Sequence, residues 1–412
     1  MSYRAERLKI LVATSVFPNS KQPCLGIFIR ERMFNAAKHC ELKVIAPVPW
    51  FPFIRYLKKD YRPCVPYLEI QDGIEIYHPR FFSVPRFFKC LDGFFFFISS
   101  ITTALNLNKN FKFDIIDSHF VYPDGFGAVL LGKFLRRPVT ITIRGTIKKL
   151  LNYPLLAIQI KYALKKAVKV FAVCNELKEV VTGLGISEGK TVVIPNGVDI
   201  EKFKPVEKLK MRSELGIPAD KKIIISVGGL VERKGFHRVL SVLPRVKQAI
   251  PDIMYVMVGG PSVEGNYGPV LMRMVKELSL RDYVMFAGQQ LHDNLYKWFS
   301  ASDIFCLATS NEGWANVFLE AMACGLPVVT TRVGGNEEVV SSDDYGMLFE
   351  LEDKDGMAYA IIKSVQKEWN REKIINYARK NTWDIRINHL ISQFNSVINS
   401  YNNRLPEKAL IQ

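Results

Sequence analysis

One stretch decides the fold class of this chain: Ile304-Phe-Cys-Leu307-Ala-Thr-Ser-Asn311-Glu-Gly-Trp-Ala-Asn-Val-Phe-Leu-Glu320-Ala-Met-Ala-Cys-Gly325-Leu-Pro327-Val-Val-Thr330. The apolar run at its start predicts a buried strand, and a polar turn follows it. A helix is expected to begin near Ala315 and to stop at Gly325, because glycine is the usual residue just past a helix end. Pro327 then opens a second strand. A strand, a helix and a strand in this order predict a parallel sheet covered by helices.

The same alternation of short apolar runs and longer amphipathic stretches occurs in both halves of the chain. In the first half we expect strands at Leu8–Ala13, Leu42–Ala46, Phe113–Asp117, Val139–Ile143, Val168–Val173 and Thr191–Ile194. In the second half we expect strands at Lys222–Val227, Met254–Val258, Tyr283–Phe286, Ile304–Leu307 and Pro327–Thr330. Helices are expected there at Phe236–Ala249, Val270–Leu278, Leu291–Ala301 and Asn316–Cys324. The sequence therefore predicts an α/β protein with two doubly wound, Rossmann-like domains.

The segment Ile194–Pro205 is rich in turn residues and marks the expected domain boundary. We place the first domain at residues 1–197 and the second at 198–384. A last helix, about Trp383–Tyr401, has no strand after it. We expect this C-terminal part, about residues 385–412, to pack back on the first domain.

The composition predicts a globular protein with an anionic partner. Apolar residues make up 48% and charged residues 23% of the chain, and 56 Lys and Arg face 40 Asp and Glu. The seven cysteines are scattered without a C-x-x-C pair, which indicates a reduced chain without structural zinc. The charged start before Ile10 does not read as a signal peptide. A cytoplasmic location is expected.

Glu312 and Glu320 are predicted to occupy different places around one helix N-terminus. Glu312 lies in the turn beyond a strand, where open α/β sheets bind ligands, and Glu320 lies more than one turn into the helix. The free N–H groups between them suit a diphosphate. We assign Glu312 to the hydroxyls of a sugar and Glu320 to those of a ribose. The alternative is a loop residue and a solvated helix face.

The pattern E-x7-E followed by Ala321-Met-Ala-Cys-Gly-Leu-Pro-Val-Val329 resembles family 4 of the glycosyltransferases, which are retaining enzymes of the two-domain GT-B architecture. Further segments resemble that family in the same order along the chain. These are Pro18 to Gly26-Ile-Phe28, Asp117-Ser-His119-Phe-Val-Tyr-Pro123-Asp-Gly125, Arg144-Gly145-Thr146, Pro195-Asn-Gly-Val-Asp199, Val227-Gly-Gly-Leu-Val-Glu-Arg233-Lys234-Gly235 and Val333-Gly-Gly-Asn-Glu-Glu338. The match is weakest from about Phe51 to Asn110.

The resemblance implies a nucleoside-diphosphate sugar as donor, an acceptor bound by the first domain, and no cofactor or metal. It implies two domains that face each other across a cleft. The implied catalytic residues are His119, Glu312, Lys234 and Arg233. The implied donor-binding residues are Gly26, Arg144, Asn196, Gly228, Gly313, Trp314, Ala315, Asn316, Val317 and Glu320.

Arg233 and Lys234 follow a strand and precede a helix, so they are expected to clamp a diphosphate. An exposed charge pair is the alternative. In the family the Lys before Gly contacts the donor diphosphate. Gly229 stands where the family usually has an arginine, which leaves Arg233 and Lys234 as the expected clamp.

His119 and Arg144 follow neighbouring strands of the first domain and are expected at the same edge of its sheet. In the resembling family a histidine at this place hydrogen-bonds the donor sugar or the acceptor. A structural role is the alternative, and Asp124 is a weaker candidate. Gly26 is expected to let backbone approach the ligand.

Two motifs are set aside. Gly185-Ile-Ser-Glu-Gly-Lys-Thr191 looks like a phosphate-binding loop, but its glycines are too close and it precedes a strand. Asp353-Lys-Asp355 looks like the D-x-D metal site of another glycosyltransferase architecture, but it is expected to begin a helix.

The segment Phe81–Leu107 is rich in phenylalanine, and its uncharged part is shorter than the roughly 20 residues that cross a bilayer. Together with Arg86, Lys89 and the similar segment Trp50–Lys59, it could lie in a membrane interface. A buried helix with a mobile lid is the alternative.

The sequence thus predicts a retaining glycosyltransferase that acts on a glycan or lipid-linked saccharide in cell-envelope polysaccharide synthesis, such as teichuronic-acid-like or exopolysaccharide synthesis. A peripheral contact with the anionic inner face of the cell membrane is a further expectation, and nucleic acid is not an expected partner because the basic residues are not gathered with base-stacking motifs. A nucleotide-sugar epimerase of the same architecture and a non-catalytic membrane-surface protein are the alternatives. The donor base, the sugar and the acceptor stay undetermined by the motifs.

Overall fold

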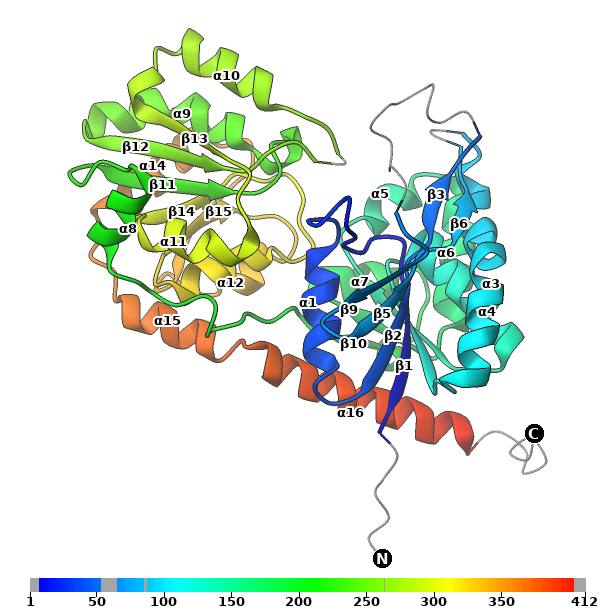
Figure 1. Ribbon diagram of the computed structural model, residues 1–412. Helices are drawn as coiled ribbons and strands as arrows, with labels where there is room; N and C mark the ends of the chain where they lie inside the picture. The colour runs from blue at the N-terminus through cyan, green and yellow to red at the C-terminus, as the bar shows by residue number, and fades with distance from the viewer. Residues whose placement is uncertain (1–6, 53–64, 85–86, 263, 404–412) are drawn as a thin grey trace, which may run out of the picture. The chain divides into compact units, whose positions relative to one another are not determined.

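The computed structural model describes residues 7–52, 65–84, 87–262 and 264–403. The chain forms two compact units (Figure 1). Unit 1, the N-terminal unit, contains Met1–Asn196 and Arg386–Gln412, and unit 2, the C-terminal unit, contains Gly197–Ile385. The division after Asn196 lies one residue before the boundary expected from the turn-rich segment.

Unit 1 is built on an eight-stranded sheet in the order β10-β9-β8-β7-β1-β2-β5-β4. Neighbouring strands are parallel except β4 and β5, which form an antiparallel hairpin. The strands are β1 (Lys9–Ala13), β2 (Glu41–Ile45), β4 (Leu68–Gln71), β5 (Ile74–Tyr77), β7 (Ile115–His119), β8 (Val139–Ile143), β9 (Lys169–Ala172) and β10 (Thr191–Val193). A separate pair consists of β3 (Val48–Trp50) and β6 (Arg80–Phe82).

The helices of unit 1 cover this sheet, and α3 packs on α4, which packs on α6. The helices are α1 (Ile27–Ala36), α3 (Asp92–Asn110), α4 (Phe126–Leu135), α5 (Ile147–Leu151), α6 (Pro154–Lys166) and α7 (Asn175–Gly183). Short turns of helix are η1 (Lys89–Leu91), η2 (Val121–Gly125) and η3 (Glu188–Lys190).

Unit 2 has a fully parallel six-stranded sheet in the order β13-β12-β11-β14-β15-β16. The strands are β11 (Lys222–Val227), β12 (Ile253–Val258), β13 (Val284–Gly288), β14 (Ile304–Leu307), β15 (Val328–Thr331) and β16 (Gly346–Phe349). The helices are α8 (Lys208–Leu215), α9 (Phe236–Ala249), α10 (Gly268–Glu277), α11 (Leu295–Ser300), α12 (Asn316–Ala323), α13 (Asn336–Val339), α14 (Lys354–Gln366) and α15 (Arg371–Arg379). Numbered within the unit, the strand order is that of a dinucleotide-binding Rossmann domain.

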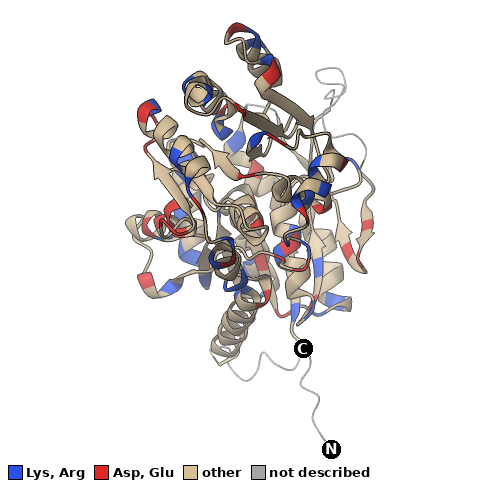
Figure 2. Ribbon diagram, turned by 90° about the vertical axis from the view of Figure 1, so that its left-hand side faces the viewer, with Lys and Arg blue, Asp and Glu red and all other residues tan. Residues whose placement is uncertain are grey.

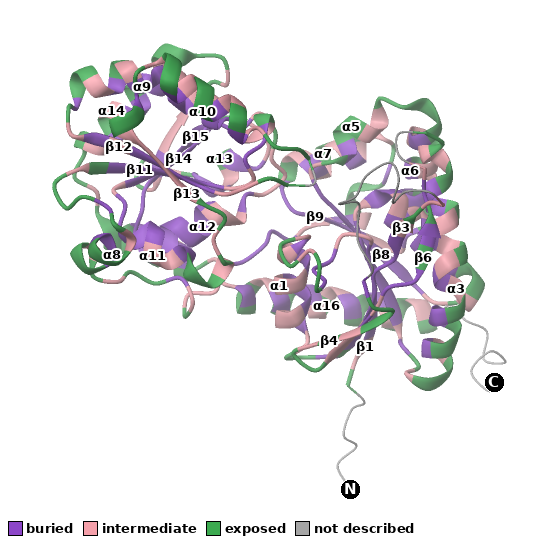
Figure 3. Cartoon of the chain, turned by 45° about the horizontal axis from the view of Figure 1, so that its top comes forward, coloured by how far each residue is buried: buried purple, intermediate pink, exposed green. Residues whose placement is uncertain are grey.

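Both faces of the second sheet are buried, which explains its continuous apolar strands. Ile223 and Ile225 of β11 contribute to one core cluster with α12 and α15, whereas Ile224 between them contributes to the other with α9 and α14. Side chains alternate between the faces of a strand, so an unbroken apolar run is needed when helices cover both sides. Figure 3 shows β11, β12, β14 and β15 as largely buried.

The strands β3 to β6 and the last strand, β16, are absent from the sequence-based predictions. In β4 and β5 only Ile76 is fully buried, so an apolar run was absent. The signal that could have found them is Asp72-Gly73, whose φ angles of 49° and 79° form the turn of the hairpin.

The last helix, α16 (Trp383–Asn402), runs over the range expected for it. From Arg386 onward it belongs to unit 1, where the rings of Phe394 and Phe171 meet at 5.7 Å. The two motifs that were set aside also lie as expected. Glu188–Lys190 forms a helical turn before β10, and Asp353 caps α14 by accepting a hydrogen bond from the Gly356 N–H.

Candidate functional site

The candidate site in unit 2 lies where the strand order reverses. β11 and β14 are neighbours, but the chain continues from β11 to one side of the sheet and from β14 to the other. Loops that diverge in this way leave a crevice at the carboxyl ends of the strands, where doubly wound folds bind ligands. Arg233 and Lys234 follow β11 in a helical turn, η4 (Glu232–Lys234), and Glu312 follows β14.

Gly235 brings these two loops together. Its φ of 74° is left-handed, and a Cβ there would lie 1.8 Å from the carbonyl oxygen of Ala308. Only glycine allows this approach. The Arg233 carbonyl accepts hydrogen bonds from the Ser310 N–H at 2.9 Å and the Thr309 hydroxyl at 3.1 Å. The loops are therefore joined through their backbones before any charged side chain takes part.

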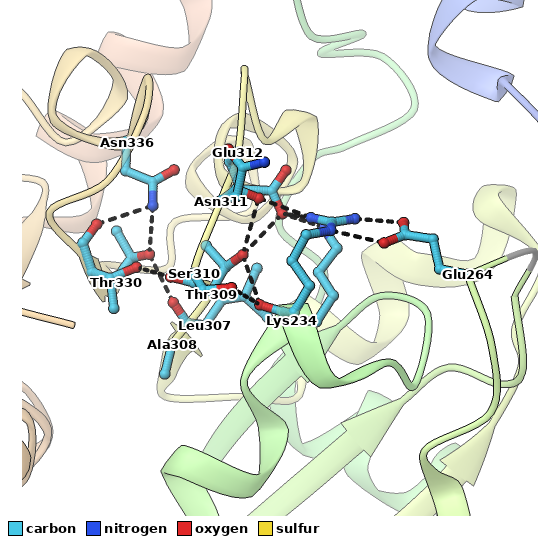
Figure 4. Close-up of polar contacts among 12 residues, drawn as sticks. Lys234, Glu264, Leu307, Ala308, Thr309, Ser310, Asn311, Glu312, Thr330 and Asn336 are labelled. Carbon is cyan, nitrogen blue, oxygen red and sulfur yellow. Dashed lines mark hydrogen bonds and ion pairs between the residues drawn. The ribbon is translucent and has the colours of Figure 1, made fainter. Parts of the chain in front are cut away.

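Arg233 and Lys234 meet at one oxygen of Glu312. Figure 4 shows Lys234, Glu312 and Glu264 in this cluster. Glu312 Oε1 lies 2.6 Å from Lys234 Nζ, 2.9 Å from Arg233 Nη1 and 3.3 Å from the Thr309 hydroxyl oxygen. Burial alone raises the pKa of the Glu312 carboxyl, but the two cations outweigh burial and lower it below its ordinary value. Glu312 is therefore a carboxylate held by two positive groups.

Glu264 is a partner of this cluster that the motifs did not indicate. Its carboxylate accepts two hydrogen bonds from Arg233, at 2.7 and 2.9 Å. These bonds, ahead of the Glu312 charge, raise the pKa of Arg233 above its ordinary value. The signal that could have found Glu264 is its glycine-rich loop after β12, which ends at the same edge of the sheet. A ligand anion must compete with Glu264 for Arg233.

Glu320 is buried in α12, so the alternative of a solvated helix face is wrong. Its Oε1 lies 2.9 Å from His292 Nε2, and His292 Nδ1 lies 2.9 Å from Lys202 Nζ. The Lys202 ammonium group can only donate, so His292 Nδ1 accepts its hydrogen bond. His292 Nε2 then carries the hydrogen and donates it in a hydrogen bond to Glu320. His292 also packs its ring edge against Phe203 at 5.2 Å. The sequence missed His292 and Lys202, which belong to no motif.

The remaining residues predicted at this end of unit 2 line the turn and the start of α12. Gly228, with φ 156°, lies beneath the aliphatic part of Lys234. Ala315 is the N-cap residue of α12 and makes no side-chain cap hydrogen bond to the helix. Trp314 and Val317 pack against the core, Asn316 opens the helix, and Gly313 joins Glu312 to this segment. These placements are compatible with an anion at the helix N-terminus.

Unit 1 gathers a different set of polar residues at the carboxyl ends of β7 and β8. Arg144 Nη2 lies 3.2 Å from His119 Nδ1, and His119 Nε2 lies 3.3 Å from Asp117 Oδ2. Arg144 also stacks over the Phe28 ring at 4.6 Å. Both ring nitrogens of His119 thus face protein groups. A substrate can contact this imidazole only if Arg144 or Asp117 moves away from it.

Burial dominates the electrostatics of this cluster. It lowers the pKa of His119 to about 4, opposed by Asp117 and assisted by Arg144, so the imidazole is neutral at physiological pH. Burial likewise lowers the pKa of Arg144 well below its ordinary value and that of Arg32 to about 10.

The other residues predicted in unit 1 have structural contacts. Gly26 has φ 67°, and a Cβ there would lie 2.3 Å from the Val16 carbonyl oxygen, so its backbone is close to protein. Asn196 is buried and accepts a hydrogen bond from Arg32 at 3.4 Å. Asp124 accepts from the Thr14 hydroxyl and the Ser15 N–H. Their roles toward a ligand stay predictions.

The predicted site residues therefore form two sets in two units. Lys234, Arg233 and Glu312 are in direct contact, with Glu320 on the following helix, and His119 contacts Arg144. Across residues 7–52, 65–84, 87–262 and 264–403, no three His, Cys, Asp or Glu side chains are grouped to hold a metal ion.

Comparison with known proteins agrees with this architecture. A family model described as "Glycosyl transferases group 1" matches residues 207–381, and one described as "Glycosyltransferase Family 4" matches residues 36–202. A putative teichuronic acid biosynthesis glycosyltransferase of Bacillus subtilis is 28% identical over 377 residues, covering 89% of this chain and 91% of the relative. The N-acetyl-alpha-D-glucosaminyl L-malate synthase of Bacillus anthracis is 27% identical, covering 69% of this chain and 74% of the relative.

Solved structures share the fold. Sucrose-phosphate synthase from Thermosynechococcus elongatus superposes with a TM-score of 0.76 at 20% identity, covering 96% of this chain and 100% of that chain. HepE of Anabaena in complex with UDP superposes with a TM-score of 0.71 at 18% identity, covering 94% and 100%. The expected arrangement of two Rossmann-like domains is confirmed at the level of fold.

Proposed function

The chain belongs to the family 4 glycosyltransferases of the GT-B fold, and from that premise we propose that it transfers a sugar, with retention of configuration, from a nucleoside-diphosphate sugar to a hydroxyl of a glycan or lipid-linked acceptor. The observation that carries the proposal is the meeting of Lys234 and Arg233 at Glu312 Oε1, at the switch point of the second sheet. We place the reaction in cell-envelope polysaccharide synthesis, as the name of the teichuronic acid relative suggests, and expect it at the cytoplasmic side of the cell membrane.

The cations suit the charge that develops on a departing diphosphate. The side chains of Lys234 and Arg233 are 17% and 29% exposed. A ligand can therefore reach both cations, and each can exchange a carboxylate oxygen for a phosphate oxygen. The start of α12 offers backbone N–H groups without a side-chain cap. Such preorganised donors stabilise a leaving group without a protein nucleophile. We expect no resident metal to be required.

The two carboxylates have separate tasks in this proposal. Glu312 leaves its cations to the diphosphate and accepts hydrogen bonds from hydroxyls of the donor sugar. Glu320 accepts one hydrogen bond from His292 through Oε1 and keeps its second oxygen for the ribose. His119 and Arg144 are assigned to the sugar or the acceptor, with the imidazole neutral.

A thermal-shift screen of the full chain tests the proposal. Nucleoside diphosphates of uridine, guanosine, adenosine, cytidine and thymidine, and their sugars, are added in turn. A donor at about one hundred times its Kd stabilises the folded state by about 2.7 kcal/mol, which raises the melting temperature. The product formed with an acceptor is then examined by NMR for retained anomeric configuration.

The control is Lys234→Ala, which should lose the shift and keep the melting temperature of the free enzyme. Silence with every nucleotide would overturn the proposal. Incubation of the donor alone separates transfer from epimerisation, because an epimerase converts the sugar without an acceptor.

A further inference from the structure

Helix α3 of unit 1 exposes several large apolar side chains, although Phe96 and Leu107 of the same helix are buried. Leu91 at the end of η1 and Phe94, Ile98 and Leu105 of α3 are between 43% and 48% exposed. They recur at intervals of three, four and seven residues, which places them on one face. We call this the outer face of α3.

The inner side of α3 combines small and polar residues with two large apolar ones. Gly93, Ser100, Thr103 and Ala104 are buried there together with Phe96 and Leu107. The Thr103 hydroxyl is hydrogen-bonded to Tyr67 at 2.6 Å, so it has a partner within the unit. The helix therefore has apolar side chains on its exposed side in addition to those that it buries.

α3 packs closely on α4. A Cβ at Gly127 of α4 would lie 2.9 Å from the Gly93 carbonyl oxygen and 2.5 Å from the Phe96 ring. The Phe96 ring therefore occupies the contact between the two helices, beside the two glycines. The apolar residues of the outer face take no part in this contact.

The apolar surface continues beyond α3. Phe87 and Phe88, just before η1, are 65% and 70% exposed. On α6, Leu155 and Ile158 are 62% and 66% exposed. α6 lies beside η1, because the Gln159 amide donates to the Cys90 carbonyl at 2.8 Å. Figure 3 shows exposed segments on both α3 and α6.

The charge of the surrounding helices has one sign. Basic residues occur on both units (Figure 2), but α3 to α6 contain one acidic residue, Asp92, which is buried and paired with Lys89. The same four helices contain seven exposed lysines: Lys109, Lys133, Lys148, Lys149, Lys161, Lys165 and Lys166. Lys148 pairs with Glu176 of α7. The helices α3 to α6 therefore combine exposed apolar side chains with an excess of exposed lysines.

We propose that η1, α3 and α6 form a surface that binds an anionic lipid bilayer, with Phe87, Phe88 and the outer face of α3 in the headgroup region. Exposed phenylalanines beside lysines are the composition of an interfacial helix. A second copy of the chain is disfavoured as the occupant, because two such faces would bring lysines against lysines.

The helix lies on the bilayer and does not cross it. The helix Lys89–Asn110 is long and apolar enough to span a membrane. The uncharged part of this segment, taken alone in the sequence, is too short to do so. Its inner side, however, is packed on α4 and hydrogen-bonded within unit 1. The proposal is independent of sugar transfer, since it concerns residues of unit 1 to which the transfer reaction assigns no role.

Vesicle co-sedimentation of the full chain tests the proposal. Vesicles of phosphatidylglycerol mixed with phosphatidylcholine should bind the protein, and binding should weaken with salt, whereas pure phosphatidylcholine should bind it poorly. The variant Phe88→Ser, Phe94→Ser, Ile98→Ser should bind at least about tenfold more weakly.

The matched control is Leu209→Ser, Met272→Ser, Tyr359→Ser, three equally exposed apolar residues of unit 2. It should bind vesicles like the unchanged protein, and both variants should keep the melting temperature of that protein. Equal vesicle binding by the two triple variants would overturn the proposal. So would a dimer in solution that the α3 variant dissociates, because the surface would then be a self-interface.

Discussion

The polar clusters at the carboxyl ends of the two sheets differ in how their charges are held. In unit 2, the cations Arg233 and Lys234 are balanced by the carboxylates of Glu312 and Glu264, and Arg233, Lys234 and Glu312 are between 11% and 29% exposed. In unit 1, Asp117, His119 and Arg144 are at most 7% exposed. A partly exposed, balanced cluster can exchange one partner for a ligand at little cost, whereas a buried cluster cannot. The cluster of unit 2 is therefore suited to exchange a protein partner for a ligand, whereas the cluster of unit 1 is suited to hold its side chains in a fixed geometry.

Lys234→Ala is expected to have the largest effect on this comparison. It removes the cation nearest to Glu312 and should lower kcat/KM for sugar transfer roughly 10²–10³-fold, the range for loss of one preorganised electrostatic contact. Arg233 remains to pair Glu312, so the fold should persist. Steady-state kinetics and a melting curve check both statements. Turnover near that of the unchanged enzyme would remove Lys234 from the mechanism.

The buried cluster predicts a dependence of stability on pH. The pKa of His119 is about 4 in the folded protein, against an ordinary value of 6.5, so the unfolded state binds the proton first as pH falls. Stability should therefore decrease between pH 6.5 and 4, by up to roughly 3 kcal/mol from this group. Chemical denaturation at several pH values measures it.

The variant His119→Gln should flatten this part of the pH profile. His39→Gln is the matched control, because His39 is exposed, and its profile should follow that of the unchanged protein. Identical slopes for both variants would show that His119 is not held neutral by burial.

Glu312→Gln is expected to separate sugar contact from diphosphate contact. Sugar transfer should fall roughly 10²-fold, because a charge-assisted acceptor for the sugar hydroxyls is lost. Binding of the nucleoside diphosphate alone should be unchanged or tighter, since Lys234 and Arg233 no longer have this carboxylate as a competitor. Calorimetric titration measures that binding. Equal losses for diphosphate and diphosphate sugar would contradict the assignment of Glu312 to the sugar.

His292 is expected to have the smallest effect, because it acts by positioning Glu320. His292→Ala should raise the donor KM by roughly tenfold, and His292→Gln should restore most of it by returning an N–H donor. The His292→Ala variant and the unchanged protein should bind 2′,3′-dideoxynucleoside diphosphates with equal affinity, because these analogues lack the ribose hydroxyls from which Glu320 would accept hydrogen bonds. A loss that persists with these analogues would indicate a structural role only.

Most strands of both sheets lie at or near their predicted positions. β8, β11 and β14 begin and end at the predicted residues, because strands covered on both faces are rich in apolar and β-branched residues. β4 and β5 escaped prediction because they lie at the edge of the sheet and are half-exposed. Only the turn residues Asp72 and Gly73, and not the apolar pattern, indicate this hairpin in the sequence.

The sequence by itself determined the local parts of this protein: two runs of strand and helix, the helix between Asn316 and Gly325, and the spacing that sets Glu312 before it and Glu320 within it. Such features follow from backbone geometry over a few residues. Only the tertiary structure decided that Glu264 holds Arg233, that His292 and Lys202 orient Glu320, and that His119 is neutral. These facts depend on strand order and burial, which bring distant residues together and remove water from around them.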